Sequence, residues 1–173
     1  NRGRIEVRAK LLAGKGMWPA IWLLGTNINQ VGWPACGEID IMEFVGYDPK
    51  TIYANVHCKK YNHSVGNNKG ASIEAKNPTE AYHLYAIEWT GDKIDFFFDE
   101  TKYFTYQNEG TGFDAWPFDE PHYLILNAAI GGSWGGREGI DDSICPQEYH
   151  IDYVRVYEQT TASTATHRFP TKH

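Results

Sequence analysis

The sequence lacks several features that would each point to a particular class of protein. It contains no stretch of about 18 consecutive apolar residues, so no segment is expected to span a bilayer. It has no cluster of Lys and Arg, and its formal net charge is −6, which argues against binding to the phosphate backbone of a nucleic acid. Its three cysteines, Cys36, Cys58 and Cys145, do not have the spacing of a zinc site, and their odd number leaves at least one thiol unpaired.

Aromatic residues, by contrast, are abundant. The 173 residues suit a single domain with a hydrophobic core, and 42% hydrophobic with 22% charged residues is ordinary for a globular protein. Aromatic residues make up 14%, including six Trp and eleven Tyr, which is more than a core of this size needs. Some of them should therefore line a surface that binds flat rings. Because the charge disfavours nucleic acid, sugar rings are the expected ligand.

The periodicity of the sequence is that of β-strands. No segment keeps a helical period, whereas apolar and charged residues alternate from residue 4 to residue 11 in the pattern of a half-buried strand. Many short strands joined by loops with Gly and Pro predict an all-β fold, an antiparallel β-sandwich of two sheets. The further strand-like runs lie near residues 38–45, 52–58, 82–89, 93–98, 102–106, 122–130 and 149–157.

The two ends of the chain depart from this pattern. Residues 159–173 contain little apolar material, and we expect them to be a disordered tail or a linker. Residues 1–3 lead directly into a strand, as though earlier strands were missing. We therefore predict one domain over residues 1–158 that is incomplete at its N-terminus.

The segment Glu38-Ile-Asp-Ile-Met-Glu43 combines acidic and apolar residues in an unusual way. Side chains alternate along a strand, so Glu38 and Asp40 should share one face while the isoleucines point into the core. A regular strand would bury Glu43 on the apolar side, which is costly for a carboxylate. An extra residue in a β-bulge, with Met42 as the candidate, returns Glu43 to the face of the other two acids.

Three carboxyls on one surface repel one another and call for a functional explanation. Cleavage of a glycosidic bond with retention of configuration uses two carboxyls roughly 5–5.5 Å apart, one a nucleophile and the other an acid that later acts as a base. The third acid can hold the nucleophile and separate the pKa values. An exposed acidic strand edge or a calcium site is the alternative interpretation, but the surrounding apolar run, the required bulge and the nearby Trp residues favour catalysis.

The same residues resemble glycoside hydrolase family 16 and, within it, the laminarinases, which are endo-β-1,3-glucanases. The resemblance extends from residue 3 to about residue 157. Its motifs lie at residues 3–10, 16–22, 33–37, 38–43, 85–89, 116–118, 124–132 and 151–157.

This resemblance implies a concanavalin A-like β-jelly roll with a glucan cleft on its concave face, in a secreted, extracellular enzyme. It implies Glu38 as nucleophile, Asp40 as its helper and Glu43 as general acid/base, with no cofactor for catalysis. The extra residue Met42 favours the laminarinases over the lichenases, although galactan-cleaving relatives also carry the bulge. We expect endo-hydrolysis of β-1,3-glucan; the alternatives are mixed-linkage β-1,3-1,4-glucan, a galactan, or a non-catalytic β-glucan-binding lectin.

Trp18, Trp22 and His57 are predicted to contact the substrate. The two Trp residues are four positions apart and share a strand face, and Trp rings stack on pyranose rings. His57 ends the strand expected to pair with the acidic one, and the resemblance implies a His beside the catalytic acids. Core packing remains the alternative for each of them.

Four further residues are weaker candidates for substrate binding. Trp33, Trp116 and Trp134 could equally pack in the core. Asn127 lies inside an apolar strand, so we expect a buried amide that needs partners, either sugar hydroxyls or backbone groups.

Asp152 is an acid in an otherwise apolar strand, where the resemblance implies a possible structural calcium on the convex side. The family's remaining calcium ligands come from strands near the N-terminus that this chain does not contain. A missing N-terminal segment of the same domain is accordingly an expected partner.

Overall fold

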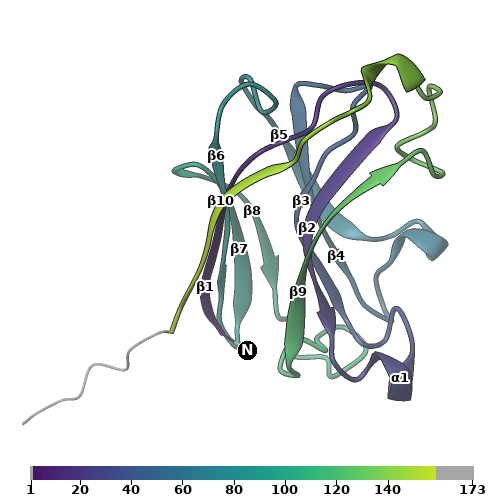
Figure 1. Cartoon of the computed structure of the whole chain (residues 1–173). Helices are drawn as coiled ribbons and strands as arrows, with labels where there is room; N and C mark the ends of the chain where they lie inside the picture. The colour runs from purple at the N-terminus through teal and green to yellow at the C-terminus, as the bar shows by residue number, and fades with distance from the viewer. Residues whose placement is uncertain (1, 159–173) are drawn as a thin grey trace, which may run out of the picture.

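The computed structural model describes residues 2–158, and the predicted tail at 159–173 lies outside this range. Two five-stranded antiparallel sheets pack face to face, which confirms the predicted sandwich (Figure 1). Sheet A has the order β10 (His150–Tyr157), β1 (Gly3–Lys10), β6 (His83–Trp89), β7 (Lys93–Phe98) and β8 (Thr101–Gln107). Sheet B has the order β5 (Lys69–Glu74), β4 (Thr51–His57), β3 (Glu38–Glu43), β2 (Met17–Gly25) and β9 (His122–Ile130).

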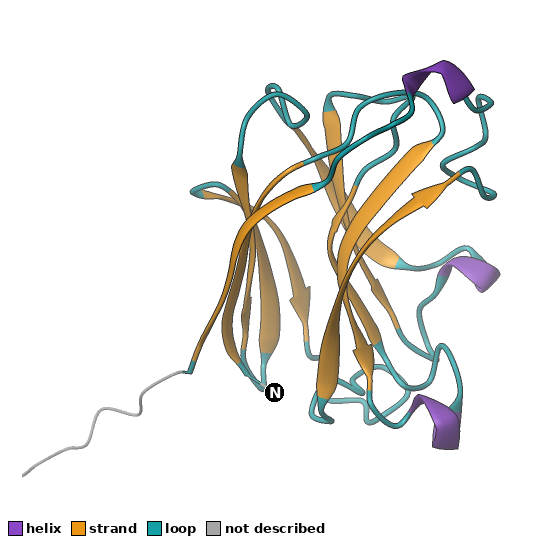
Figure 2. Cartoon of the chain, in the orientation of Figure 1, coloured by secondary structure: helices purple, strands orange, loops and turns teal. Residues whose placement is uncertain are grey.

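Helical structure is confined to short pieces in the loops (Figure 2). These are α1 (Ile28–Val31) and two 3-10 turns, η1 (His63–Val65) and η2 (Asp142–Ile144). None of the described helices is long and apolar enough to cross a bilayer. The sequence patterns missed β5, because this edge strand is mostly exposed and carries only one large apolar side chain, Ile73.

The core lies between the sheets. Alternate residues of each inner strand point into it, and Ile39 and Ile41 of β3 belong to the same buried cluster as Ile87 of β6 and Phe96 of β7. Trp89 is part of this cluster too, as its place in the sequence predicts. Burial of each such side chain stabilises the fold by about 1.5–3 kcal/mol.

The interior is uncovered between β9 and β10, the strands at the same side of the two sheets. Paired residues of adjacent antiparallel strands point to the same face, so Val154, which pairs with the fully buried Val7, points to the core side. Val154 is nevertheless 42% exposed, and Val156 on the same side is 66% exposed. Ile130, at the end of β9, is 58% exposed.

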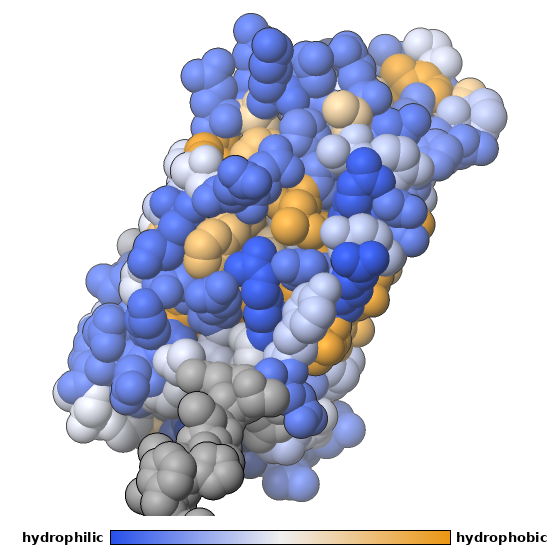
Figure 3. Space-filling view, turned by 90° about the vertical axis from the view of Figure 1, so that its left-hand side faces the viewer, coloured by the Kyte–Doolittle hydropathy of each residue, from blue (hydrophilic) through white to orange (hydrophobic). Residues whose placement is uncertain are grey.

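The outer face of sheet A is more polar than the apolar region between β9 and β10. Figure 3 looks onto that side of the molecule and shows mainly hydrophilic residues with apolar patches between them. Arg4, for example, forms ion pairs with Glu6 and Glu88 across β1 and β6. The uncovered apolar surface thus lies along the open side of the sandwich, where the outer edges of strands β9 and β10 are unpaired and core side chains are exposed.

We expect the isolated chain to associate through this open side, because unpaired edges with exposed apolar residues favour pairing with other chains. The apparent mass measured by light scattering should rise with protein concentration. Val156→Lys combined with Ile130→Lys should reduce this rise, since lysine at both places charges the apolar margin.

Val65→Lys is the matched control, because Val65 is 67% exposed but lies in η1, away from β9 and β10. A monodisperse monomer at every concentration, or an equal effect of Val65→Lys, would contradict the expectation.

Candidate active site

The predicted β-bulge is present in β3. Asp40 pairs with Trp22 of β2 and Met42 pairs with Ile21, which leaves Ile41 between them without a partner. Ile41 and Met42 are both buried in the core. The bulge therefore has the predicted effect, although the residue unpaired toward β2 is Ile41 rather than Met42. Because two successive side chains point inward, the acids on either side of them point outward together.

A cleft of about 680 Å³ lies on the face of sheet B that is turned away from sheet A. Strands β2, β3, β4 and β9 form its floor, and the loops after β4 and β9 form its sides. Its lining residues are Trp18, Ala20, Trp22, Glu38, Asp40, Glu43, Tyr53, Asn55, His57, His63, Asn68, Asn127, Ala129, Ser133 and Trp134. The cleft thus brings together all three acids and most of the predicted substrate-binding residues.

Two neighbouring strands fix the carboxylate of Glu43. The indole Nε1 of Trp18 on β2 donates to its Oε1 at 3.2 Å, and Nδ2 of Asn55 on β4 donates to its Oε2 at 2.9 Å. Each carboxylate oxygen therefore has one donor, which restricts the rotation of the side chain within the cleft.

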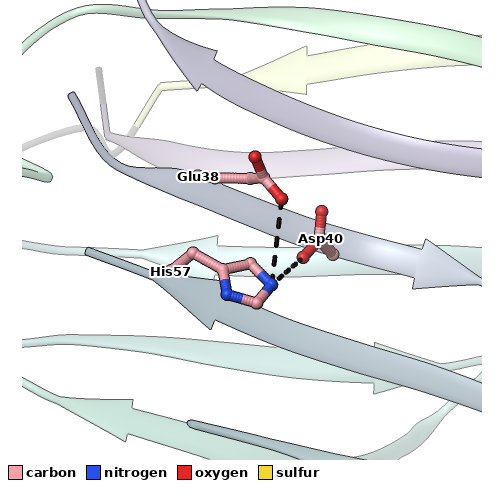
Figure 4. A group of neighbouring side chains, drawn as sticks. All are labelled: Glu38, Asp40 and His57. Atoms are coloured by element: carbon pink, nitrogen blue, oxygen red, sulfur yellow. Dashed lines mark ion pairs between the residues drawn. The ribbon is translucent and has the colours of Figure 1, made fainter. Parts of the chain in front are cut away.

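Glu38 is held at the other end of the acidic strand. The indole Nε1 of Trp33 donates to its Oε2 at 2.8 Å. Its Oε1 lies 3.8 Å from Nε2 of His57, and this nitrogen also lies 3.3 Å from Oδ2 of Asp40 (Figure 4). Trp33 is not among the lining residues, but its hydrogen bond holds Glu38, which is.

Burial raises the pKa values of all three acids, and repulsion between neighbouring carboxylates adds to the rise for Glu38 and Asp40. Burial, followed by the charge of Asp40, raises the pKa of Glu38 to about 8, although His57 and the Trp33 hydrogen bond pull it down. Burial and then the charge of Glu43 raise the pKa of Asp40 far above its usual range. Burial also raises the pKa of Glu43, against the hydrogen bonds from Asn55 and Trp18. Not all three carboxyls can be ionised together at neutral pH.

The two histidines of the cleft, His57 and His63, have lowered pKa values, which favour their neutral forms. Burial lowers the pKa of His57 even though Glu38 and Glu43 act in the opposite direction. Burial and the neighbouring His57 lower the pKa of His63. The His63 ring packs against Trp33, with centroids 4.8 Å apart, and against His57 at 5.1 Å.

Aromatic rings build the end of the cleft beside Glu43. Trp134, from the loop after β9, packs edge-on against Trp18 with centroids 5.6 Å apart and against Tyr53 at 5.0 Å. The Tyr53 hydroxyl donates to Asp48 at 2.7 Å, which holds the ring in place. Trp134 therefore belongs to the cleft, where its large flat surface suits a pyranose ring.

Asn127 also lies in the cleft, but not as a buried amide. It is exposed because β9 is an edge strand, and its Oδ1 accepts a hydrogen bond of 2.8 Å from Nε1 of Trp22. The residue as a whole lines the cleft. Trp22 and Asn127, both predicted from the sequence, are thus joined by a hydrogen bond on the floor of the cleft.

Trp116 is not in the cleft, and its prediction as a substrate-binding residue requires correction. Its ring stacks on Tyr106, with centroids 5.7 Å apart, and meets Phe118 edge-on at 5.3 Å. Only 4% of the residue is exposed. Two aromatic partners elsewhere in the chain draw Trp116 into the core.

Asp152 is also remote from the cleft, on β10 of sheet A. Its carboxylate forms an ion pair with the guanidinium of Arg8 on β1, a charge that disfavours a cation at the same place. Asp152 belongs to none of the groups of three or more metal-ligating side chains in the described chain. These surroundings do not fit a calcium ion.

Several lining residues are absent from the sequence-based prediction. Tyr53 and Asn55 precede His57 at intervals of two on β4, so strand alternation from His57 could have identified both. His63, Asn68 and Ser133 lie in loops or at a strand margin, where the sequence carries no comparable periodic signal.

Comparison with known proteins shows what this chain is similar to. The β-glucanase of Rhodothermus marinus is 44% identical over 162 residues, which cover 90% of this chain and 57% of that protein. The keratan-sulfate endo-1,4-β-galactosidase of Sphingobacterium multivorum is 41% identical over 161 residues, covering 90% of this chain and 36% of that protein. The X-ray structure of the laminarinase from Rhodothermus marinus has a TM-score of 0.89 at 42% identity, covering 92% of this chain and 66% of that one.

The chain thus spans less than two thirds of the length of each of these relatives. The model of the glycosyl hydrolases family 16 matches residues 2–155, which include the bulged acidic strand and the whole cleft floor. The chain belongs to the glycosyl hydrolases family 16.

Proposed function

We propose that this chain hydrolyses internal bonds of β-1,3-glucan by a retaining, two-step mechanism. The observation that carries the proposal is the bulged strand β3, which places Glu38, Asp40 and Glu43 together on the floor of an aromatic-walled cleft. Retaining glycoside hydrolysis needs two carboxyls on such a surface, one as nucleophile and one as acid and then base.

The first step forms a glycosyl-enzyme. Glu38 attacks the anomeric carbon while Glu43 transfers its proton to the departing glycosidic oxygen, so one C–O bond forms as the other breaks. In the second step Glu43, now a carboxylate, takes a proton from water, and the resulting hydroxyl displaces Glu38. Two inversions give a product with the β-configuration of the substrate.

The contacts of the three acids support this division of roles. Asp40 is the most buried of the three, so ionisation costs it most, and its raised pKa favours the protonated form. The hydrogen bond from Trp33 and the neighbouring His57 oppose the rise in the pKa of Glu38, and so favour the anion that the attack requires. Burial raises the pKa of Glu43, which favours the protonated form that the first step needs.

Charge in the cleft favours a neutral polysaccharide. Among the described residues that line it there is no Lys or Arg, whereas three are acidic. A sulfated galactan would meet like charge in this cleft, so the observation favours glucan over keratan sulfate or carrageenan. Trp18 and Trp134 offer ring faces for stacking, and Asn127 and Asn55 offer polar groups for hydroxyls.

We also propose that the chain acts outside the cell and that a strand-forming segment of the same domain covers β9 and β10. A long polysaccharide does not cross membranes, which supports secretion. The exposed core-side residues Val154, Val156 and Ile130 support a covering segment, and so does the greater length of the relatives.

Substrate choice is tested by product analysis on laminarin, lichenan, agarose and carrageenan. We expect oligosaccharides from laminarin, with a β-configured reducing end in the first NMR spectra, and no release from carrageenan. An α-configured first product would refute the mechanism. Binding to insoluble glucan without any release of reducing sugar would instead support the lectin alternative.

The roles of the two glutamates are tested by removing each in turn. Glu38→Gln should lower kcat on laminarin by at least about a thousandfold, because no other group can attack the anomeric carbon. In Glu38→Ala, added azide should enter the vacated space and yield an α-glycosyl azide. In Glu43→Ala, with an aryl glycoside whose leaving group needs no proton, azide should replace water and yield a β-glycosyl azide.

Glu80→Gln is the control for these variants, since Glu80 is an exposed glutamate outside the cleft. It should retain the parent activity. An active Glu38→Gln protein, or the two azide products exchanged between the variants, would overturn the assignment.

The raised pKa of Glu38 also predicts how stability depends on pH. Its folded-state pKa of about 8 exceeds the value near 4.5 expected in the unfolded chain, so the folded state holds more protons between these pH values. Stability from this group is fully present below about pH 4.5 and is lost as pH rises through 8.

Glu38→Gln removes this loss. Its melting temperature should exceed that of the parent by on the order of 5 °C at pH 9, and the difference should shrink below pH 5. Thermal unfolding followed by circular dichroism measures both values, with Glu80→Gln as control. A melting-temperature difference that is the same at pH 5 and pH 9 would refute the prediction.

A further inference from the structure

One oxygen of the acidic cluster lacks any hydrogen-bond partner. Oδ2 of Asp40 is buried without a hydrogen bond, and the residue is only 3% exposed. It points toward Nε2 of His57, a residue that is 4% exposed and whose other ring nitrogen, Nδ1, is also without a hydrogen bond. Buried polar atoms normally have partners, so this arrangement indicates an occupant that the protein atoms do not supply.

The atoms around this oxygen have the spacing of metal ligands. Nε2 of His57 lies 3.3 Å from Oδ2 of Asp40 and 3.8 Å from Oε1 of Glu38 (Figure 4). One ligand atom from each of the three residues lies within 4.8 Å of the others. Ligand atoms about 2.0–2.1 Å from a tetrahedral Zn²⁺ are roughly 3.3 Å apart, so small side-chain movements complete the geometry.

The donor types indicate which metals fit. One imidazole nitrogen and two carboxylate oxygens suit Zn²⁺ and similar transition-metal ions, whereas Ca²⁺ and Mg²⁺ prefer oxygen ligands alone. The imidazole Nε2 of His57 is directed at both carboxylates, and histidine nitrogen is a common ligand of such metals. No Lys or Arg lines the described cleft to neutralise the acids, so a dication meets no competing positive charge.

We propose that Glu38, Asp40 and His57 form a binding site for Zn²⁺ or a similar divalent transition-metal ion. The fourth position of the tetrahedron faces the open cleft and takes a water molecule. The bound ion engages the Glu38 oxygen that faces His57, in the space where a sugar ring reaches this carboxylate. Metal and polysaccharide therefore exclude each other.

Metal binding itself does not depend on the proposed hydrolysis, but its inhibitory effect does. If the chain cleaves laminarin, Zn²⁺ should raise the apparent KM without changing kcat, and a chelator should reverse the effect. If the chain cleaves no polysaccharide, the binding measurement still tests the site, so failure of one proposal is distinguishable from failure of the other.

The experiment measures Zn²⁺ binding to the full-length chain by titration calorimetry and Co²⁺ binding by its visible absorption. A background variant with Cys145→Ser, His167→Gln and His173→Gln removes an exposed thiol and two histidines outside the described residues. In this background we expect one ion per chain and the absorption of a tetrahedral Co²⁺ centre with one nitrogen and several oxygen ligands.

Substitution of the ligands should remove this binding. His57→Gln and, separately, Asp40→Asn should each weaken Zn²⁺ binding at least about tenfold. Circular dichroism without metal checks that each variant is folded. His150→Gln is the matched control, because His150 also pairs with a carboxylate, that of Glu148, but at the exposed surface of β10.

The control should bind Zn²⁺ like the background. Unchanged affinity in folded His57→Gln and Asp40→Asn, or loss of binding in His150→Gln instead, would overturn the proposal. Octahedral Co²⁺ spectra with oxygen ligands alone would overturn it as well.

Discussion

Strand β3 has to bury two apolar side chains in succession, and the geometry of the cleft depends on this requirement. Ile41 and Met42 both point into the core, so the strand gains one residue relative to its neighbours. Without that residue Glu43 would lie on the inner face. The same backbone distortion thus satisfies the packing of the core and brings the Glu43 carboxyl into the cleft.

The acids that share this face make the site electrostatically costly. Burial raises the pKa of each acid, repulsion adds to the rise for Glu38 and Asp40, and the hydrogen bonds from Trp18, Trp33 and Asn55 offset only part of the effect. Functional sites commonly hold groups in such unfavourable surroundings, because a retained proton on one acid and a charge on another are what the chemistry uses. Two of these donors are indoles, so Trp residues here position carboxylates.

Local patterns in the sequence were sufficient for the centre of the site. Glu38, Asp40 and Glu43 follow from strand alternation and from the energetic cost of burying a carboxylate, and both operate within six residues. Trp116 and Trp134 could not be told apart in this way. Each lies in a loop, and what separates them is the Tyr106 ring beside one and the Trp18 ring beside the other.

Sheet position was equally hard to read from the sequence. Asn127 was expected to be buried because its neighbours are apolar, but β9 is an edge strand, so the amide is exposed. His63 and Asn68 reach the cleft through a loop whose path depends on the buried side chain of Asn62 and its hydrogen bonds to Cys58 and Lys59. Such contacts between distant or irregular segments leave no periodic trace.

Strand β9 serves two surfaces at once, since it is the open edge of sheet B and, through Asn127 and Ala129, part of the cleft floor. A polypeptide that pairs with this edge therefore widens the floor of the cleft, which we propose as the surface that binds a sugar chain. If a saccharide contacts both the floor and the added strand, the pairing of the strand with β9 increases the affinity for the saccharide. By thermodynamic linkage, the bound saccharide then increases the affinity of the strand for β9 by the same factor. The binding of the added strand and the binding of the saccharide are then coupled equilibria.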